Sequence, residues 1–183
     1  MSPSGDILRV MRRIAPLALS VLVAAAVWSS AASSQDLIAA AKSGDLARVK
    51  ILLNQKTDLG IKDAAGVTAL GRAAEAGHTE VVRLLIEKGA NVNEATSTGV
   101  TALMVAGQTG KADLVRLLLE HGADVNAKDT WRGMTALYSA KNAEIAKLLI
   151  ERGADVKGTP GKQTVLSWVA EHGQTDVILV LLE

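Results

Sequence analysis

The sequence of 183 residues has no cysteine and no phenylalanine, and aromatic residues make up only 2% of it. Without cysteine there is no disulfide framework, no thiolate metal site and no thiol redox chemistry. The formal net charge of +1 does not indicate a nucleic-acid or membrane-surface partner. Yet 49% of the residues are hydrophobic, mainly Ala, Leu, Val and Ile. This composition favours helices packed closely through small side chains and argues against disorder of the whole chain.

The first 34 residues have the pattern of a targeting segment. An apolar, uncharged run at residues 14–28 is followed by small residues at 29–34, and it is preceded by Arg9, Arg12 and Arg13. This order is typical of a secretory signal peptide, so we expect export with cleavage between Ala31 and Ser34. The run is shorter than the roughly 20 residues that span a bilayer. An uncleaved N-terminal anchor is the alternative interpretation.

Beyond residue 34, short motifs return at a nearly fixed interval. A Thr-Ala-Leu or Thr-Val-Leu triplet begins at Thr68, Thr101, Thr135 and Thr164, with spacings of 33, 34 and 29 residues. A Gly-Ala-Asn/Asp-Val motif begins at Gly89, Gly122 and Gly153. Independent markers that share one period indicate a repeat protein.

Each unit has the pattern of two short helices. In the second unit Thr68 is a good N-cap for a helix at 69–76, and Gly77 suits the left-handed position that ends it. A second helix is expected at 79–88, with apolar residues on one face and charged residues on the other. One such pair cannot bury its own apolar face, so the units are expected to stack on one another.

The second unit closely resembles the ankyrin repeat. The resemblance rests on Thr68-Ala-Leu-Gly-Arg-Ala-Ala-Glu-Ala-Gly-His78, Glu80-Val-Val-Arg-Leu-Leu-Ile86 and Gly89-Ala-Asn-Val-Asn93. It extends over residues 35–183 and implies an all-α repeat fold, an ankyrin solenoid of about five helix-turn-helix units with β-hairpin fingers, and a protein-binding role. The expected units are about 35–63, 64–96, 97–130, 131–159 and 160–183, the last of them truncated.

The sequence departs from the family pattern in two ways. The family's proline after the threonine is Ala or Val in every repeat, and the family's histidine two positions later is replaced by Gly71, Met104, Tyr138 and Ser167. Both changes are expected to weaken local packing and hydrogen bonding.

The fourth repeat is irregular. It has three residues fewer between Thr135 and the acidic residue of its second helix, so residues 140–143 are expected to join its helices tightly. The finger before Thr135 is one residue longer than the finger before Thr101, and it contains Trp131, Arg132 and Met134. Fingertips face solvent in stacked repeats, and Trp and Arg are enriched at binding hot spots. These three residues are therefore the first predicted partner-binding set. In the alternative, Trp131 folds back onto the shortened repeat.

A second predicted set lies on the concave side, directly before the turn glycines. It consists of Glu75, Gln108, Thr109, Glu171 and His172, which match contact positions of the family. A simple solvated face is the alternative. Trp168 and Tyr138 are expected to pack in the core.

The two ends of the repeat array differ in polarity. The first unit has a polar exterior, as a capping repeat requires, and Asp36 is expected to cap its first helix. The last helix instead presents Leu179 and Val180. We expect these residues to contact a further repeat, a partner or a second copy of the chain.

No catalytic or ligand-binding chemistry is apparent in the sequence. The three histidines lie in different repeats without the spacing of metal ligands, and neither a phosphate-binding loop nor a nucleophile elbow occurs. The sequence predicts a non-enzymatic protein, periplasmic or secreted, that binds another protein and uses no cofactor, metal or nucleic acid. The alternatives are a secreted effector or toxin-associated protein acting on another cell, and a membrane-anchored structural scaffold.

Overall fold

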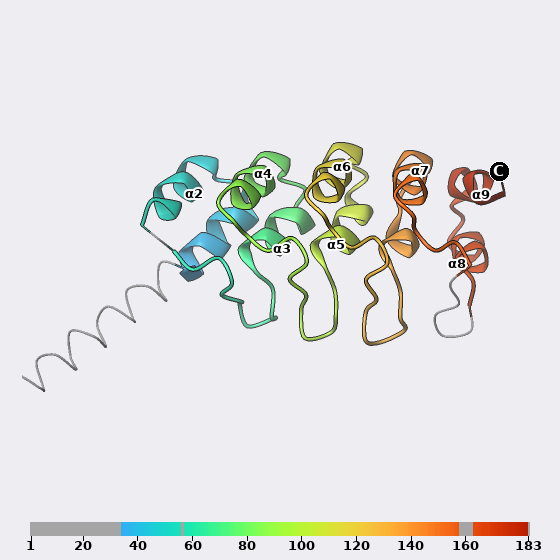
Figure 1. The fold of residues 1–183 in the computed structure, drawn as a ribbon, viewed down its shortest axis with the longest axis horizontal. Helices are drawn as coiled ribbons and strands as arrows, with labels where there is room; N and C mark the ends of the chain where they lie inside the picture. The colour runs from blue at the N-terminus through green and yellow to red at the C-terminus, as the bar shows by residue number, and fades with distance from the viewer. Residues whose placement is uncertain (1–33, 56, 158–162, 183) are drawn as a thin grey trace, which may run out of the picture.

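The computed structural model describes residues 34–55, 57–157 and 163–182 as a row of helix pairs that follow one another along a single axis (Figure 1). Most of the expected signal segment, residues 1–33, lies outside the described residues. None of the helices in the described ranges is long and apolar enough to cross a membrane.

The helices form two layers, with long loops on the far side of one of them (Figure 1). After a first helix described over 34–43, the outer layer contains α2 (Leu46–Leu53), α4 (Thr79–Glu87), α6 (Ala112–Glu120), α7 (Ala143–Glu151) and α9 (Thr175–Leu182). The inner layer contains α3 (Ala69–Glu75), α5 (Ala102–Thr109), the 3₁₀ helix η1 (Ala136–Ser139) and α8 (Val165–Glu171). The expected all-α repeat fold is confirmed.

The repeated threonines stand at the N-caps of the inner helices, as predicted. The hydroxyl oxygen of Thr68 accepts a hydrogen bond from the backbone N–H of Gly71 at 3.2 Å, and Thr164 accepts the equivalent bond at 3.1 Å. Thr101 and Thr135 hold the same position, but their buried hydroxyls have no partner in the described part of the chain. The caps of repeats two and five are therefore better satisfied than those of repeats three and four.

Glycine ends the inner helices where the backbone turns into the outer helix. Gly77 and Gly110 have φ angles of +71° and +76°, in the left-handed region that a side chain disfavours. The predicted role of these glycines is confirmed.

Small side chains allow the inner helices to pack closely. Ala73, Ala74 and Ala106 are completely buried, and Leu85, Leu118 and Leu149 of the outer layer are equally inaccessible. Within the described ranges Tyr138 is the one aromatic residue in the buried hydrophobic core. The core therefore closes through Ala, Leu, Val and Ile, as the composition predicts.

Neighbouring repeats are also joined by asparagine side chains. Asn93 donates from Nδ2 to the carbonyl of Gly122 at 2.9 Å, and its Oδ1 accepts from the backbone N–H of Asp124 at 2.8 Å. One repeat further on, Asn126 makes the same two bonds, to Gly153 and from Asp155, both at 2.9 Å. Each asparagine satisfies one donor and one acceptor of the next repeat's turn.

We expect Asn93→Ala to weaken the coupling between repeats two and three. Loss of two hydrogen bonds should lower the free energy of unfolding by about 1–2 kcal/mol. Since the lost bonds link repeats, the urea transition should also broaden. Circular dichroism during urea titration measures both quantities.

Asn91→Ala is the matched control for this prediction. The Asn91 side chain bonds only within its own segment, donating to Glu94 at 3.2 Å and accepting from the Asn93 backbone at 3.0 Å. The control should shift the midpoint without broadening the transition. Equal broadening in both variants would contradict the coupling role of Asn93.

The fourth repeat is tightened in the expected manner. Its inner element is a single 3₁₀ segment of four residues, where the other inner helices have seven or eight. Lys141 donates from its backbone N–H to the Gly107 carbonyl at 3.1 Å. Asn142 then caps α7 by accepting from Ile145 N–H at 3.0 Å, and it donates to the Gly110 carbonyl at 3.3 Å. The link of residues 140–143 thus bonds back to the preceding repeat.

The fingers differ in one respect from the expected β-hairpins. In each finger a backbone N–H of one arm donates a hydrogen bond to a carbonyl of the other arm. The donor and acceptor pairs are Asp63 and Val67, Thr96 and Val100, and Asp129 and Met134, all at 3.0 Å. The structure has no strand within the described ranges, only an isolated antiparallel bridge between Lys62 and Thr68. One paired position per finger is too little for a ladder. The third of these fingers is one residue longer between its paired positions, as predicted.

Asp36 does not cap the first helix, contrary to expectation. It lies inside that helix, which already includes Ser34. Its carboxylate instead lies 3.6 Å from the guanidinium of Arg48 on α2. The helix extends further toward the N-terminus than the capping pattern suggested.

Candidate functional site

A groove lies between the finger of the fourth repeat and the inner elements α5, η1 and α8. Its volume is about 440 Å³. Its lining includes Met104, Gln108, Trp131, Met134, Tyr138, Lys141, Trp168, His172 and Gln174. We call this feature the aromatic groove.

Aromatic and cationic side chains form a continuous series along the aromatic groove. The guanidinium carbon of Arg132 lies 4.2 Å from the Trp131 ring centroid and 5.9 Å from that of Trp168. Trp168 meets Tyr138 edge-on, with centroids 6.3 Å apart, and stacks on His172 at 4.0 Å. Arg132 therefore bridges the finger and the fifth repeat through cation–π contacts.

The short inner element of the fourth repeat accounts for the position of the groove. Because η1 is one 3₁₀ segment between the full helices α5 and α8, it brings fewer side chains to this surface than its neighbours. Tyr138 and Ser139 of η1 line the groove, together with Met104 and Trp168 from the flanking helices. The three-residue deletion seen in the sequence thus coincides with a recess.

Asp129 holds the finger in shape. Its Oδ1 accepts hydrogen bonds from the backbone N–H groups of Arg132, Gly133 and Met134, at 2.8, 2.8 and 3.2 Å. These bonds fix the tip that carries Trp131. Asp129 was not among the residues expected from the sequence, although Asp is a common turn residue because it bonds nearby backbone groups.

Tyr138 is a neutral hydrogen-bond donor within the groove. Desolvation by burial, followed by the charge of Asp155, raises the pKa of its phenol to about 12. Its hydroxyl donates to the Gln163 carbonyl at 3.3 Å. The expectation that Tyr138 packs in the core is confirmed.

The structure brings together five of the predicted partner-binding residues. Trp131, Met134, Gln108 and His172 line the aromatic groove, and Arg132 stacks on its two tryptophans. Trp131 is 75% exposed, so it does not fold back into the shortened repeat. Whether these residues bind a partner stays a prediction.

The remaining predicted residues of the concave set lie elsewhere. Glu75 lines a separate hollow, and Glu171 is exposed without lining the aromatic groove. Thr109 is half-buried, and its hydroxyl donates to the Ala106 carbonyl at 2.8 Å. Trp168, expected in the core, is only partly buried, and its exposed part faces the groove.

The outer face of α9 is apolar, but its composition differs from the expectation. Leu179 is 65% exposed, as predicted. Val180 is partly buried against the core, and Leu182, at 67% exposure, takes its place at the surface. The helical turn places positions 179 and 182 on one side and turns 180 inward.

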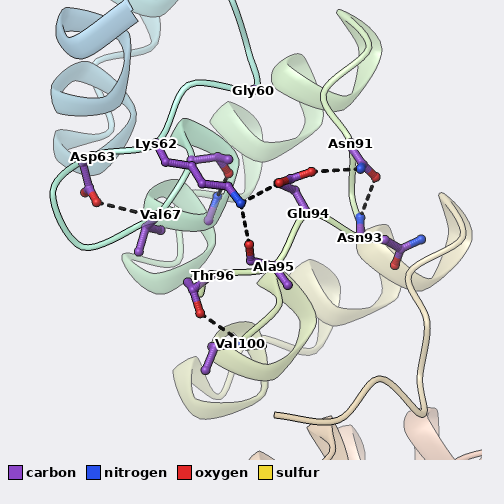
Figure 2. A network of polar contacts seen from close by, with 12 residues as sticks. Gly60, Lys62, Asp63, Val67, Asn91, Asn93, Glu94, Ala95, Thr96 and Val100 are labelled. Carbon is purple, nitrogen blue, oxygen red and sulfur yellow. Dashed lines mark hydrogen bonds and ion pairs between the residues drawn. The ribbon is translucent and has the colours of Figure 1, made fainter. Parts of the chain in front are cut away.

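The second hollow, of about 270 Å³, lies between the fingers of repeats two and three. Arg72 lies at its side, where Nε donates to Asp63 at 2.7 Å and Nη1 donates to Glu75 at 2.8 Å. Figure 2 shows that Lys62 reaches across to the next finger, to Glu94 at 2.7 Å and to the carbonyl of Ala95 at 2.8 Å. This polar network ties adjacent fingers together.

Two carboxyl groups of the network have lowered pKa values. The hydrogen bond from Arg72 holds the pKa of Asp63 below its usual value, with help from the backbone N–H groups of Val67 and Ala65. The hydrogen bond from Lys62 does the same for Glu94. Both groups are therefore ionised in the folded protein at neutral pH.

We expect Asp63→Asn to lower the free energy of unfolding by about 1 kcal/mol at pH 7, because the charged partner of Arg72 is lost. Because the pKa of Asp63 is lower in the folded than in the unfolded chain, its ionised form stabilises the folded protein. This contribution is fully present above the ordinary carboxyl pKa of about 4, and it is lost as the pH falls through the lowered pKa. The difference in the free energy of unfolding between wild type and Asp63→Asn should therefore become smaller toward pH 3. Urea unfolding at several pH values measures it.

Asp113→Asn, on α6 and outside this network, is the control. Its free energy of unfolding should change with pH in nearly the same way as that of the wild type. A difference between wild type and Asp63→Asn that stays constant from pH 7 to 3 would contradict the role of the ionised Asp63.

The described residues contain no group of three acidic or histidine side chains placed to hold a metal ion. The arrangement is that of a repeat protein, a stack of helix pairs that carries a recessed aromatic surface.

Comparison with known protein families gives the same classification. A family model of ankyrin repeats, in three copies, matches residues 37–129, just over half of the chain. The chain belongs to the ankyrin-repeat family, whose repeats are protein-interaction modules. No curated protein matches it. The matched range ends within the finger of the fourth repeat, so the aromatic groove lies mostly in the part of the chain beyond the match.

Proposed function

We propose that this protein is an exported, non-catalytic binding module that holds a protein partner in the aromatic groove. The single observation that carries the proposal is the exposed Trp131 on a fixed finger, stacked with Arg132 beside a recess lined by Trp168 and Met104. Trp and Arg are enriched among the residues that dominate the binding energy of protein interfaces, and such residues cluster in well-packed pockets.

Rigidity of the surface supports the proposal. The finger is fixed by the three bonds to Asp129, and the inner elements are packed on a closed core. A surface that is already ordered loses little conformational entropy when a partner binds. The 75% exposure of Trp131 leaves a large apolar area for a partner to cover.

We expect Trp131→Ala to reduce partner binding at least tenfold, because a buried interfacial tryptophan commonly contributes about 2 kcal/mol or more. Affinity capture from the exported compartment, with the full chain as bait, identifies the partner. Titration calorimetry with the purified partner then measures the loss.

Arg116→Ala is the matched control for this experiment. Arg116 is exposed on α6, away from the aromatic groove, and its loss should leave binding unchanged. Retention of the same partner at unchanged affinity by both Trp131→Ala and Arg132→Ala would overturn the groove as the binding site.

Export rests on the N-terminal pattern of basic, apolar and small residues at 1–34. Ser34 lies within the first helix, so cleavage before Ser34 would leave the described part of this helix intact.

We expect the mature protein to begin between Ala32 and Ser34 and to be found outside the cytoplasm. Cell fractionation and N-terminal sequencing of the mature chain test both points. Retention in the membrane with an intact N-terminus would favour an anchored scaffold, and release into the medium would favour a secreted effector acting on another cell. A full-length chain in the cytoplasm would contradict export.

A further inference from the structure

The charges of the aromatic groove indicate the chemistry of its occupant. We propose that the groove binds a peptide segment of the partner in which a carboxylate side chain lies next to a large apolar one. This inference rests on the proposed binding function and adds the recognition chemistry to it.

Arg132 has the geometry of a carboxylate receptor. Its guanidinium is held against Trp131 at 4.2 Å and near Trp168 at 5.9 Å, and no carboxylate of the described residues lies within 4 Å of it. Contact with aromatic faces orients the guanidinium plane but leaves its edge N–H groups able to donate. A planar guanidinium matches a carboxylate with two parallel hydrogen bonds.

The lining of the groove includes one acidic residue, Asp129. Its Oδ1 accepts three backbone hydrogen bonds. The other titratable side chains of the lining are Tyr138, Lys141 and His172, and the charge of Asp155 acts on Tyr138. Two cationic side chains, Arg132 stacked on two tryptophans of the lining and Lys141 within the lining, therefore stand against one lining carboxylate, Asp129.

The floor of the groove suits a large apolar side chain. Met104, Met134, Tyr138 and Trp168 all line the groove, and methionine adapts its shape to varied partners. A volume of about 440 Å³ lies in the range of small-ligand sites, ~300–1,000 Å³. That size fits a few side chains of one segment rather than the surface of a domain.

Two polar atoms in the lining residues have no partner in the described part of the chain. They are Oε1 of Gln174 and Oγ1 of Thr135, both buried. An unsatisfied buried acceptor is unfavourable, and the amide N–H groups of an extended peptide are donors of the kind that these two oxygens lack. Hydrogen-bonding capacity therefore also favours a polypeptide.

Charge argues against a nucleic acid as the occupant. Stacking surfaces with arginine also bind bases, but such proteins carry a wider basic surface that follows the phosphate backbone. Here the whole chain has a formal charge of only +1. An acidic, apolar peptide satisfies both the local cations and the apolar floor.

Selection from a phage-displayed library of random dodecapeptides against the full chain tests the inference. We expect enrichment of sequences that place Asp or Glu beside Leu, Ile, Met or an aromatic residue. The best peptide is then synthesised together with its amide form, in which Asn or Gln replaces the acid, and both are titrated by fluorescence polarisation.

The amide form should bind the wild type about tenfold more weakly, and this difference should vanish in Arg132→Gln. Arg116→Gln is the matched control and should preserve the difference. Because Trp131 is exposed, Trp131→Ala removes one face of the Arg132 contact with little effect on folding, and it should weaken binding of the acidic peptide. Thermal unfolding of each variant verifies that it is folded.

Equal binding of the acidic and amide peptides, with loss of both in Trp131→Ala, would overturn the carboxylate chemistry and leave the groove as the binding site. Enriched peptides that bind all variants equally, or no enrichment at all, would overturn the inference. A wild-type dimer in light scattering that becomes a monomer in Trp131→Ala would identify a second copy as the occupant and would also overturn it. The effect of Trp131→Ala on the captured partner tests the proposed function independently of these peptides.

Discussion

The structure depends on contact between neighbouring repeats. A single helix pair leaves one apolar face open, and only the next pair covers it. Ala73, Ala74 and Ala106, all completely buried, let the inner helices approach, while Asn93 and Asn126 pair the turns of successive repeats. Burial and hydrogen bonding therefore act between the same neighbours, so the position of every finger and groove is determined by the repeat before it and the repeat after it.

The regular parts of this fold could be predicted from the sequence because each marker has a local physical cause. Thr68 accepts a hydrogen bond at the start of its helix, and Gly77 adopts the left-handed conformation that ends it. Both roles depend on residues close by in the sequence. The helix boundaries 69–76 and 79–88 expected from these markers differ from the observed α3 and α4 by one residue at the C-terminal end. The start of the first helix could not be predicted, because Asp36 has the character of a cap but lies within a helix that includes Ser34.

The candidate site was only partly predictable. Trp131 and Arg132 stood out through composition and through the longer finger, and Gln108 and His172 through their place before the turn glycines. Trp168 was expected in the core because its helical position is normally apolar. The residue type at one position does not show how much of a large ring remains exposed to solvent. Asp129 was missed because its function depends on the fold of the finger, where one carboxylate oxygen meets three backbone N–H groups. Contacts between separate repeats, such as that of Arg132 with Trp168, need the three-dimensional structure.

The short element η1 also has a consequence for cooperativity. In a linear array, the opening of terminal units is governed by the weakest junction, and η1 supplies only four residues to the inner layer. We therefore expect α8 and α9 to open as a unit more often than the repeats before them. The aromatic groove spans this junction, with Trp131 on one side and Trp168 on the other. An occupant would contact both sides of the junction and stabilise the folded last repeat, so that binding and the folding of this repeat are thermodynamically linked.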